Sequence, residues 1–512
     1  MTQRRGNSLD WLVKSDVCPG LFYGTPAADG FLVRLRIPGG LLDQQQVRTI
    51  ATILNHWDQP TLQVTNRGNL QLRGITTAPT PEMFQALQAV GLAAQNPQID
   101  RLRNFMVSPT AGIDPQELLD PRPYLWAIDS YLQNHPELAA LPSKFSIGID
   151  SGGVVGIGMR SPERCGAKSP ERCGAKSPER CGAKSPLAWE HRYNEIQLSA
   201  VTIKDQIYFH LALGGDKQLL DTQVVLKSAD CVSVIGALAT VYLEYSQQAP
   251  PRQQRMKHLL EDWGLEAYLE RVNQLLPTPL KRREKLALSP TIPYSYWGVH
   301  PQRQEQFSYV GINLPLGKLT AAQWISLGQL STTFGNGELR LSPWQSVIVP
   351  YVPSDQVPEL LRHLEDLGLS ASATRPDAAI VACAGKPGCA ASATHTQAHA
   401  LTLGDELIKC QIYDSTLAPL SRSGRGVGGE GFSLTPVNIH LTGCAKSCAQ
   451  ASPAEITLLG RAIERDGVMI EGYDVYVGNG QQSCAQQIYQ GTFAEILPLM
   501  PQILQRYQGQ TV

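Results

Sequence analysis

The stretch IPGGLLDQQQVRTIATIL (37–54) recurs in a weaker form as LPLGKLTAAQWISLGQLS (314–331), and this repeat determines the expected fold. Residues 36–72 align without gaps onto 313–349. Each copy has a strand, a Pro/Gly turn, an amphipathic helix, a strand and a second helix (about 81–92 and 355–367). This order predicts a ferredoxin-like unit that is present twice. The shared positions are Pro38/Pro315, Gly40/Gly317, Leu42/Leu319, Gln46/Gln323, Leu62/Leu339 and Thr65/Ser342.

We therefore expect an α+β fold in which two ferredoxin-like repeat units alternate with two larger α/β domains. The predicted segments are 18–98, 99–290, 295–370 and 375–510, and the last carries the cysteine pairs discussed below. An insert at 161–186 repeats SPERCGAK. Its Ser-Pro and Cys-Gly steps favour a solvated loop, and its loosely held cysteines (Cys165, Cys173 and Cys181) are weak metal ligands. We expect deletion of 161–184 to leave activity intact, because loop-closure entropy grows slowly with length.

Bulk composition narrows the classes of function that this chain can have. The net charge is −1, so no global field favours nucleic acid. The sequence shows neither an apolar stretch of membrane length nor a secretory h-region, so we expect no membrane association. Eleven cysteines without a disulfide-like framework suit a reducing compartment. We therefore expect a cytoplasmic enzyme.

Two cysteine pairs predict a metal centre. Cys383 and Cys389 are spaced C-x5-C, and Cys444 and Cys448 are spaced C-x3-C. Four soft thiolates are the usual ligands of a [4Fe–4S] cluster, and the small flanking residues leave room for it. A structural zinc site usually has other spacings. Two unrelated pairs of buried or free thiols remain the alternative.

A basic strand predicts an anion-binding face. TLQVTNRGNLQLRG (61–74) alternates leucines and valine with polar residues, so one face packs on the core and the other presents guanidiniums and amides. Arginine forks bind carboxylates and small oxyanions. An ordinary solvated strand face is the alternative. The candidate residues are Arg34, Arg36, Arg67, Asn69, Gln71, Arg73, Arg103 and Lys144.

Taken together, these motifs resemble the sulfite/nitrite reductase superfamily. The resemblance rests on TNRGNLQLRG (65–74), RNFMVSPTAG (103–112), LPSKFSIGID (141–150), CAGKPGC (383–389) and TGCAKSC (442–448). It implies a pseudo-twofold duplicated core in which a siroheme is coupled to the [4Fe–4S] cluster. Cys448 would be the bridging ligand. The catalytic anion site would map onto Arg67, Arg103 and Lys144.

Two departures point to one branch of that superfamily. Siroheme reductases typically carry K-x-K where this chain has Lys144-Phe145-Ser146, and GCPNxC where it has GCAKSC. The latter motif and the opening CPGLFYGTPAADGFLVRLRIPGG (18–40) resemble precorrin-3B synthases. That resemblance implies a monooxygenase of cobalamin biosynthesis, which hydroxylates C20 of precorrin-3A with O2 and closes a γ-lactone.

The same resemblance implies a [4Fe–4S] cluster, a mononuclear non-haem iron, and electrons from ferredoxin or from NAD(P)H through a reductase. The eight candidate residues of the basic face would then bind the carboxylates of precorrin-3A. A siroheme-dependent nitrite or sulfite reductase is the first alternative, and a non-catalytic iron–sulfur carrier or redox sensor is the second. His395 and His399, four positions apart, are best interpreted as a helix-surface pair.

Overall fold

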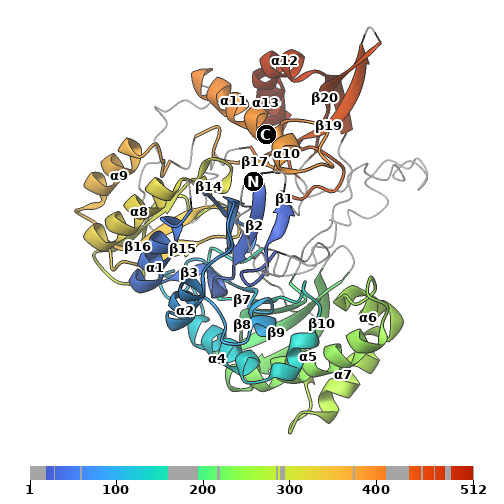
Figure 1. Ribbon diagram of the computed structural model, residues 1–512. Coiled ribbons are helices and arrows are strands. Elements are labelled where there is room, and N and C mark those ends of the chain that lie inside the picture. Colours follow the sequence, from blue (N-terminus) through green and yellow to red (C-terminus); the bar gives the residue numbers. More distant parts are fainter. Residues whose placement is uncertain are drawn as a thin grey trace, which may run out of the picture. The chain divides into compact units, whose positions relative to one another are not determined.

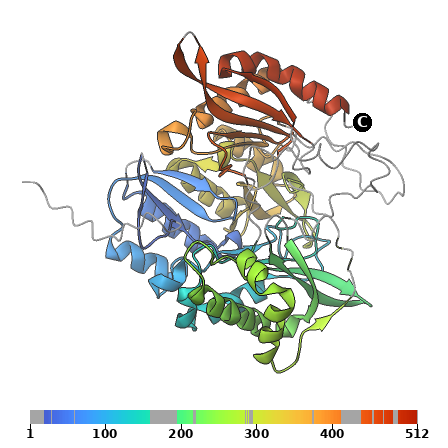
Figure 2. The ribbon, with the colours of Figure 1, turned by 90° about the vertical axis from the view of Figure 1, so that its right-hand side faces the viewer.

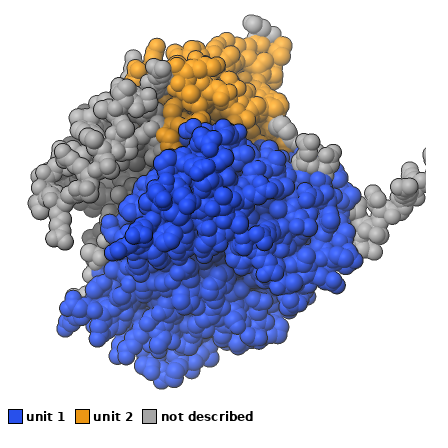
Figure 3. Space-filling model, turned by 90° about the vertical axis from the view of Figure 1, so that its left-hand side faces the viewer, with its two compact units in different colours: residues 1–164, 191–371 blue, residues 165–190, 372–512 orange. Residues whose placement is uncertain are grey.

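The computed structural model describes residues 19–510, except 28, 58–59, 159–193, 216–218, 284–285, 287, 289–293, 373–374, 411–436, 451–453, 466 and 479–485. The SPERCGAK repeats lie outside the described residues. The chain divides into two compact units, residues 1–164 with 191–371 and residues 165–190 with 372–512 (Figures 1 and 3). Each unit is described by itself below.

The first unit contains both ferredoxin-like repeats, and their elements correspond one to one. The first repeat comprises β1 (Thr25–Ala27), β2 (Gly30–Leu35), β3 (Leu41–Leu42), α1 (Gln44–Leu54), β4 (Thr61–Val64), β5 (Leu70–Ile75) and α2 (Pro81–Ala89). The second comprises β12 (Gly298–Pro301), β13 (Phe307–Ile312), β14 (Lys318–Leu319), α8 (Ala321–Phe334), β15 (Leu339–Leu341), β16 (Val347–Pro353) and α9 (Val357–Asp366).

The two repeats exchange a short strand. Their sheets have the orders β1-β2-β5-β4-β14 and β12-β13-β16-β15-β3, so each is completed by a strand from the other repeat. Lys318 and Leu319 pair with Gln63 and Leu62 on β4. By the same geometry, Leu41 and Leu42 of β3 pair with β15. The duplicated α+β fold predicted from the sequence is thereby confirmed.

A shared glutamine explains part of the sequence repeat. Gln46 and Gln323 occupy the third position of α1 and α8, where each closes a capping box with the N-cap residue, Asp43 or Thr320. Each glutamine amide also donates to a carbonyl just beyond the second helix of its repeat, at Val90 (2.9 Å) and Leu367 (3.0 Å). One side chain thus begins one helix and anchors the end of another.

The two repeats also share one hydrophobic core. It takes aliphatic residues from both sheets and from α1 and α8, and it includes Val47 and Trp324. The indole of Trp324 donates to the Val47 carbonyl across the boundary (3.3 Å). Gly40, at φ +70°, is needed there because a Cβ would lie 2.2 Å from the Leu341 carbonyl oxygen.

The rest of the first unit is an α/β domain with its own core. Its sheet has the order β11-β10-β9-β8-β7-β6, with β6, β7 and β8 parallel. Figure 2 shows the long strands of this sheet in green. Its elements are α3 (Pro97–Asp100), β6 (Phe105–Val107), α4 (Arg122–Gln133), β7 (Ile147–Asp150), β8 (Ile196–Ile203), β9 (Gln206–Gly214), β10 (Leu219–Lys227), α5 (Cys231–Gln248), α6 (Met256–Asp262), α7 (Gly264–Gln274) and β11 (Lys281–Arg282).

The second unit repeats this sheet. Its order is β17-β18-β19-β20-β21, again with three parallel strands followed by an antiparallel pair. Ile147 pairs with Phe105 and Ile196, as Ile439 pairs with Ile380 and Ile456. The elements are β17 (Ile380–Ala382), α10 (Gly385–Gly388), α11 (Thr396–Lys409), β18 (Ile439–Thr442), β19 (Ile456–Arg465), β20 (Val468–Val477), β21 (Gln486–Gly491), α12 (Phe493–Ile496) and α13 (Met500–Gln510).

One feature differs from the sequence-based expectation. The basic strand at 61–74 is a hairpin: β4 and β5 are separated by a turn in which the Gly68 amide donates to the Thr65 carbonyl (3.0 Å). The alternation survives because the residues of the turn keep the leucines of both strands on one face.

In the described part of the chain, no helix has the length and apolar character needed to cross a membrane.

Candidate functional site

The two cysteine pairs begin at the carboxyl ends of neighbouring parallel strands. Cys383 follows β17 directly, and Gly443 and Cys444 follow β18. The Gly443 amide donates to the Cys383 sulfur (3.2 Å), and the Thr396 hydroxyl lies 3.4 Å from the same sulfur. This environment fits a cluster ligand.

The other two cysteines lie on the loops that follow these strands. Cys389 ends the short turn α10 and is half-buried, and Cys448 is exposed. Ser447, at φ +50°, turns the backbone immediately before Cys448. Among the described residues, no three candidate metal-ligand side chains already converge on one point. Strand topology places all four thiols on two adjacent loops, and the assignment of a cluster to them stays a prediction.

The first α/β domain has serines where the second unit begins its cysteine motifs. Ser108 follows β6 as Cys383 follows β17, and Ser151 takes the place of Gly443. The Ser151 amide donates to the Ser108 hydroxyl oxygen (3.0 Å), the same contact that Gly443 makes with the Cys383 sulfur. The backbone for holding a ligand is therefore present in both copies, and only the second copy carries thiols there.

The basic face forms a row of polar side chains across the first sheet. Register places Arg34, Gln71, Gln63 and Lys318 side by side on β2, β5, β4 and β14, opposite the core face. Arg34 donates to Gln71 (2.8 Å), and Gln71 donates to Gln63 (3.5 Å). Burial, followed by the charge of Arg73, lowers the pKa of Lys318. The row thus concentrates positive charge that binding of an anion would relieve.

Three more predicted residues lie around this row. Arg36 is buried and donates to the Pro19 carbonyl (3.3 Å). Arg67 lies half-buried in the hairpin turn. Arg73 forms a two-pronged ion pair with Asp29 (2.9 and 3.0 Å). This ion pair suits a structural role for Arg73 at the end of the basic face.

Arg103 is held by carboxylates. Its Nε and Nη2 donate to the two oxygens of Asp129 on α4 (2.8 and 2.9 Å), and Nη1 lies 3.9 Å from Asp100. Burial would lower the pKa of Arg103, but the hydrogen bond and charge of Asp129 outweigh it and raise the pKa. Its charge is largely compensated inside the protein, so the geometry favours a positioning role, and the predicted catalytic role stays untested.

Asn69 connects the hairpin to the α/β domain. Its amide oxygen accepts from the Ile37 amide (2.9 Å), and its amide nitrogen donates to the Asn104 side chain (2.9 Å). Asn104 leads into β6 and its carbonyl accepts from the Ile147 amide, at the start of β7. These hydrogen bonds of Asn69 and Asn104 hold the turn that carries Arg67 near the amino ends of β6 and β7.

The amino end of β7 carries the last predicted residues. Lys144 is exposed and has no hydrogen-bond or ion-pair partner within the described part of the chain. Ser146 is fully buried, and its hydroxyl accepts from the Glu195 amide (3.3 Å). Lys144 is therefore available for a ligand, whereas Ser146 is built into the sheet.

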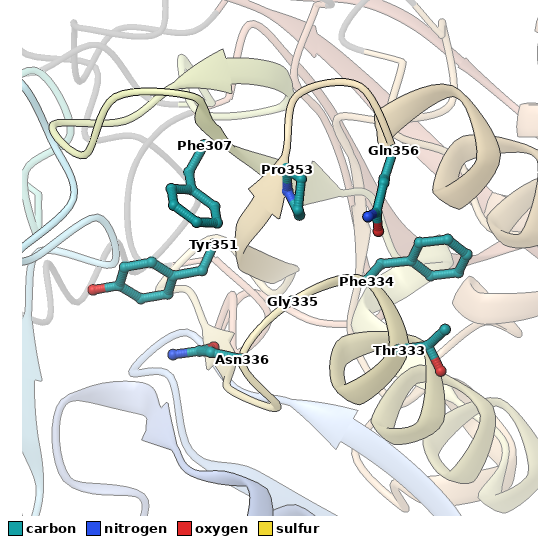
Figure 4. A pocket seen from close by; sticks show the side chains of 8 residues that line it. All are labelled: Phe307, Thr333, Phe334, Gly335, Asn336, Tyr351, Pro353 and Gln356. Carbon is teal, nitrogen blue, oxygen red and sulfur yellow. The ribbon is translucent and has the colours of Figure 1, made fainter.

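A shallow hollow lies elsewhere on the second repeat, between β13, β16 and the end of α8 (Figure 4). Phe307 and Tyr351 project toward one side of it, and Gln356 lies on another. None of the predicted site residues line this hollow. We assign it no role.

Sequence reasoning missed three contributors to the basic face: Lys318, Gln63 and Asn104. Lys318 is 284 positions after Arg34 and reaches the row only through the exchanged strand. The repeat alignment contained a usable signal, because Lys318 corresponds to Leu41, a lysine in one copy and an apolar residue in the other. Strand pairing between repeats was needed to interpret it.

Comparison with protein families agrees with this architecture. The nitrite/sulfite reductase ferredoxin-like half domain matches residues 23–90 and 300–367, which are offset by 277 residues as the repeats 36–72 and 313–349 are. The nitrite and sulphite reductase 4Fe-4S domain matches residues 98–169. These matches show that the chain contains the domain types of nitrite and sulfite reductases. The second match falls on the α/β copy that carries serines, so it identifies the domain type, whereas the cysteines lie in the other copy.

Individual relatives point the same way. The chain is 28% identical to the ferredoxin–nitrite reductase of Synechococcus elongatus, over 93% of this chain and 83% of the relative. It is 27% identical to the chloroplastic enzyme of that name from Zea mays, over 97% of this chain and 81% of the relative. The solved structure of the Mycobacterium tuberculosis NirA protein shares the fold, with a TM-score of 0.70 and 21% identity, and the match covers 93% of this chain and 80% of that one.

These relatives overturn the interpretation as a precorrin-3B synthase. The predicted oxidoreductase stands in its general form, but monooxygenase activity, precorrin-3A and O2 do not, and the mononuclear iron belonged to that interpretation alone. The interpretation rested on two local departures and the opening motif, whereas the similarity to ferredoxin–nitrite reductases spans nearly the whole chain. The short motifs near Ser146 and Cys444 are weaker indicators of function than similarity along the whole chain.

Proposed function

We propose that this chain is a ferredoxin-dependent nitrite reductase that uses a siroheme and a [4Fe–4S] cluster. The observation that carries the proposal is similarity over 93% or more of the chain to proteins named ferredoxin–nitrite reductase in a cyanobacterium and in plants. The basic face and the paired cysteines support it, because reduction of a small anion needs both positive charge and an electron path.

The four cysteines would hold the cluster. Soft thiolates suit iron–sulfur ligation, and the amide of Gly443 aimed at the Cys383 sulfur suits a charged ligand. By the superfamily resemblance, Cys448 would be one of the ligands of the cluster. When bound, the siroheme and the cluster supply one-electron transfer to nitrite.

The basic face would hold the carboxylates of a tetrapyrrole. Arg34 and Lys318 stand in one row, with Gln71 and Gln63 fixing the spacing between them. Arg36 adds a buried guanidinium on the same face. Such cations lose repulsion when carboxylates arrive, and arginine pairs with carboxylates through two parallel hydrogen bonds. This chemistry fits a polycarboxylate cofactor.

Two residues would act on nitrite itself. The guanidinium of Arg67 would donate hydrogen bonds to the nitrite oxygens, and Nζ of the exposed Lys144 would deliver a proton as negative charge builds there. Arg103 would position the loop before β6 through Asp129. Removing one well-placed donor of this kind typically lowers turnover by about 10²–10³-fold.

The test combines pigment with turnover. Protein purified without oxygen is extracted with acid and acetone, and nitrite and sulfite consumption are measured with reduced ferredoxin. We expect an extractable siroheme and faster consumption of nitrite than of sulfite, with Cys383→Ser as the inactive control. A preparation without pigment that leaves nitrite untouched would overturn the proposal. Faster consumption of sulfite would move the assignment to sulfite reduction.

A further inference from the structure

An ion-pair cluster connects the first cysteine loop to β20. Glu471 on β20 accepts from Nζ of Lys386 (2.5 Å), which lies midway between Cys383 and Cys389. The same carboxylate accepts from the backbone amide of His395 (3.1 Å) and lies 2.8 Å from its Nδ1. One carboxylate therefore fastens both the loop and the start of α11.

The electrostatics of the cluster favour a fixed carboxylate. Burial alone would raise the pKa of Glu471, but the hydrogen bonds from Lys386 and His395 outweigh it and lower the pKa to about 2. The amino end of α11, a fourteen-residue helix, adds the positive end of its dipole. Glu471 is thus charged at all physiological pH values.

Among its described residues, the serine copy has no such ion-pair cluster. By strand register, Glu471 corresponds to Ile207 on β9, because Val477 and Leu213 occupy matching positions opposite Ile456 and Ile196. The position three residues after Ser108, which matches Lys386, is Ala111. The carboxylate and its lysine are therefore present only beside the loop that carries thiols.

We propose that Glu471 is a positioning residue for the iron–sulfur cluster, which holds the Cys383–Cys389 loop in place and neutralises Lys386 beside it. The inference rests on the proposed function, because it presupposes a cluster on these cysteines. Outer partners of metal ligands keep the ligands in orientation, and their loss typically weakens metal binding by about 10–100-fold. Nearby charge also sets how easily a cluster is reduced.

The test uses Glu471→Gln, Lys386→Met and the double variant, with Glu464→Gln as the matched control. Glu464 is exposed on β19 in the same unit and carries the same charge. Iron and sulfide content, the rate of cluster loss to a chelator and the cluster's reduction potential are measured. We expect both single variants to lose the cluster about tenfold faster than wild type.

The reduction potentials separate positioning from simple damage. Glu471→Gln leaves the Lys386 cation uncompensated and should raise the potential, whereas Lys386→Met leaves the Glu471 anion and should lower it. The double variant should return the potential close to wild type while the cluster stays labile. Circular dichroism of each variant verifies that the sheet is folded.

Two results would overturn the inference in different ways. If Glu471→Gln keeps its cluster as long as Glu464→Gln does, at an unchanged potential, Glu471 has no positioning role and the proposed function stands. If wild-type protein prepared without oxygen contains no iron and sulfide, both this inference and the proposed use of a cluster fail.

Discussion

The two copies of this duplicated chain have kept different halves of the chemistry. The first copy carries the basic row Arg34, Gln71, Gln63 and Lys318, and the second has Gly311, Ile348, Arg340 and Leu41 in the same places. Conversely, the second copy has cysteines where the first has Ser108 and its neighbours. The backbone is retained in both copies, whereas the candidate ligand-binding side chains are divided between them.

In the second copy, side-chain packing covers the sheet face that carries the basic row in the first copy. The Tyr296 hydroxyl bonds to Ser342 and Ser346 (2.7 and 2.5 Å), and a Cβ on Gly311 would lie 2.0 Å from the Tyr296 carbonyl oxygen. Trp344, at the position of Arg67, packs beside Tyr296 with the ring centroids 5.6 Å apart. Aromatic packing therefore occupies the space that guanidiniums and amides line in the first copy.

The largest effect should come from exchanging the ligands of the two copies. Cys383→Ser gives the second copy the residue that Ser108 provides in the first, and a serine oxygen is a poor ligand for an iron–sulfur cluster. We expect loss of the cluster and of nitrite reduction, measured by iron content and turnover. The control is Ser108→Ala, which should leave both unchanged. Retention of a full cluster in Cys383→Ser would contradict the division between copies.

The next effect concerns the buried ion pair of the first α/β domain. Asp129→Ala leaves the Arg103 guanidinium buried without its main partner, and breaking such a pair typically costs about 3–5 kcal/mol. We expect a large fall in the free energy of unfolding, measured by denaturant titration. Arg461 and Asp474 form the comparable pair of the second unit, but the Arg461 side chain is 48% exposed. Asp474→Ala should therefore cost much less, and equal costs would contradict this reasoning.

The loop after β6 predicts a pH dependence. Burial raises the pKa of Glu117 to about 7, despite the Gly112 amide and Arg303, so the folded state holds a proton that the unfolded state releases near 4.5. Its stabilising contribution is complete below about pH 4.5 and is lost as the pH rises through about 7, by about 3 kcal/mol at most. Glu117→Gln should flatten this slope of stability against pH, and an unchanged slope would place the titration elsewhere.

A smaller effect should distinguish the hairpin turn that carries Arg67 from the matching turn of the second repeat, which carries Trp344. Arg67→Ala should lower kcat/KM for nitrite by about a hundredfold, because one charged donor to the anion is lost. The matching Trp344→Ala should change stability through lost packing but leave kcat/KM nearly unchanged. Similar losses of kcat/KM in the two variants would mean that the second copy also contributes to the anion site.

The smallest effect tests what the copies still share. Gln46→Ala and Gln323→Ala each remove one capping box and one anchor to a carbonyl, at Val90 or Leu367. We expect each to cost about 1 kcal/mol in the free energy of unfolding. Because the two contacts are equivalent, the costs should be similar, and a large difference would show that the symmetry is only geometric.

The sequence was informative where one residue had one local task. The repeat of Pro38, Gly40 and Gln46 predicted the turn and helix of each copy, because caps and left-handed turns admit few residue types. The cysteine spacing predicted a cluster site, and the structure places the two pairs on loops that follow neighbouring strands, while the cluster itself stays a prediction. The roles of Arg103 and Asn69 could not be predicted, since their partners Asp129 and Asn104 are set by tertiary packing.

Substrate identity was the least accessible inference. A polyanion-binding face suits a precorrin and a siroheme equally, because both present carboxylates to the same guanidiniums. Local departures at Ser146 and beside Cys444 then decided the interpretation, and similarity along the whole chain reversed it. Residue chemistry predicted a class of ligand but could not choose between members of that class.

The exchanged strands constrain the order in which this protein can assemble during synthesis. The first sheet lacks its edge strand until residues 318–319 have been made, and β3 remains unpaired until β15 at 339–341 emerges. The intervening α/β domain has its own core and can close first. During synthesis on a ribosome, the N-terminal repeat therefore keeps an incomplete core until the second repeat, encoded far downstream, has been made.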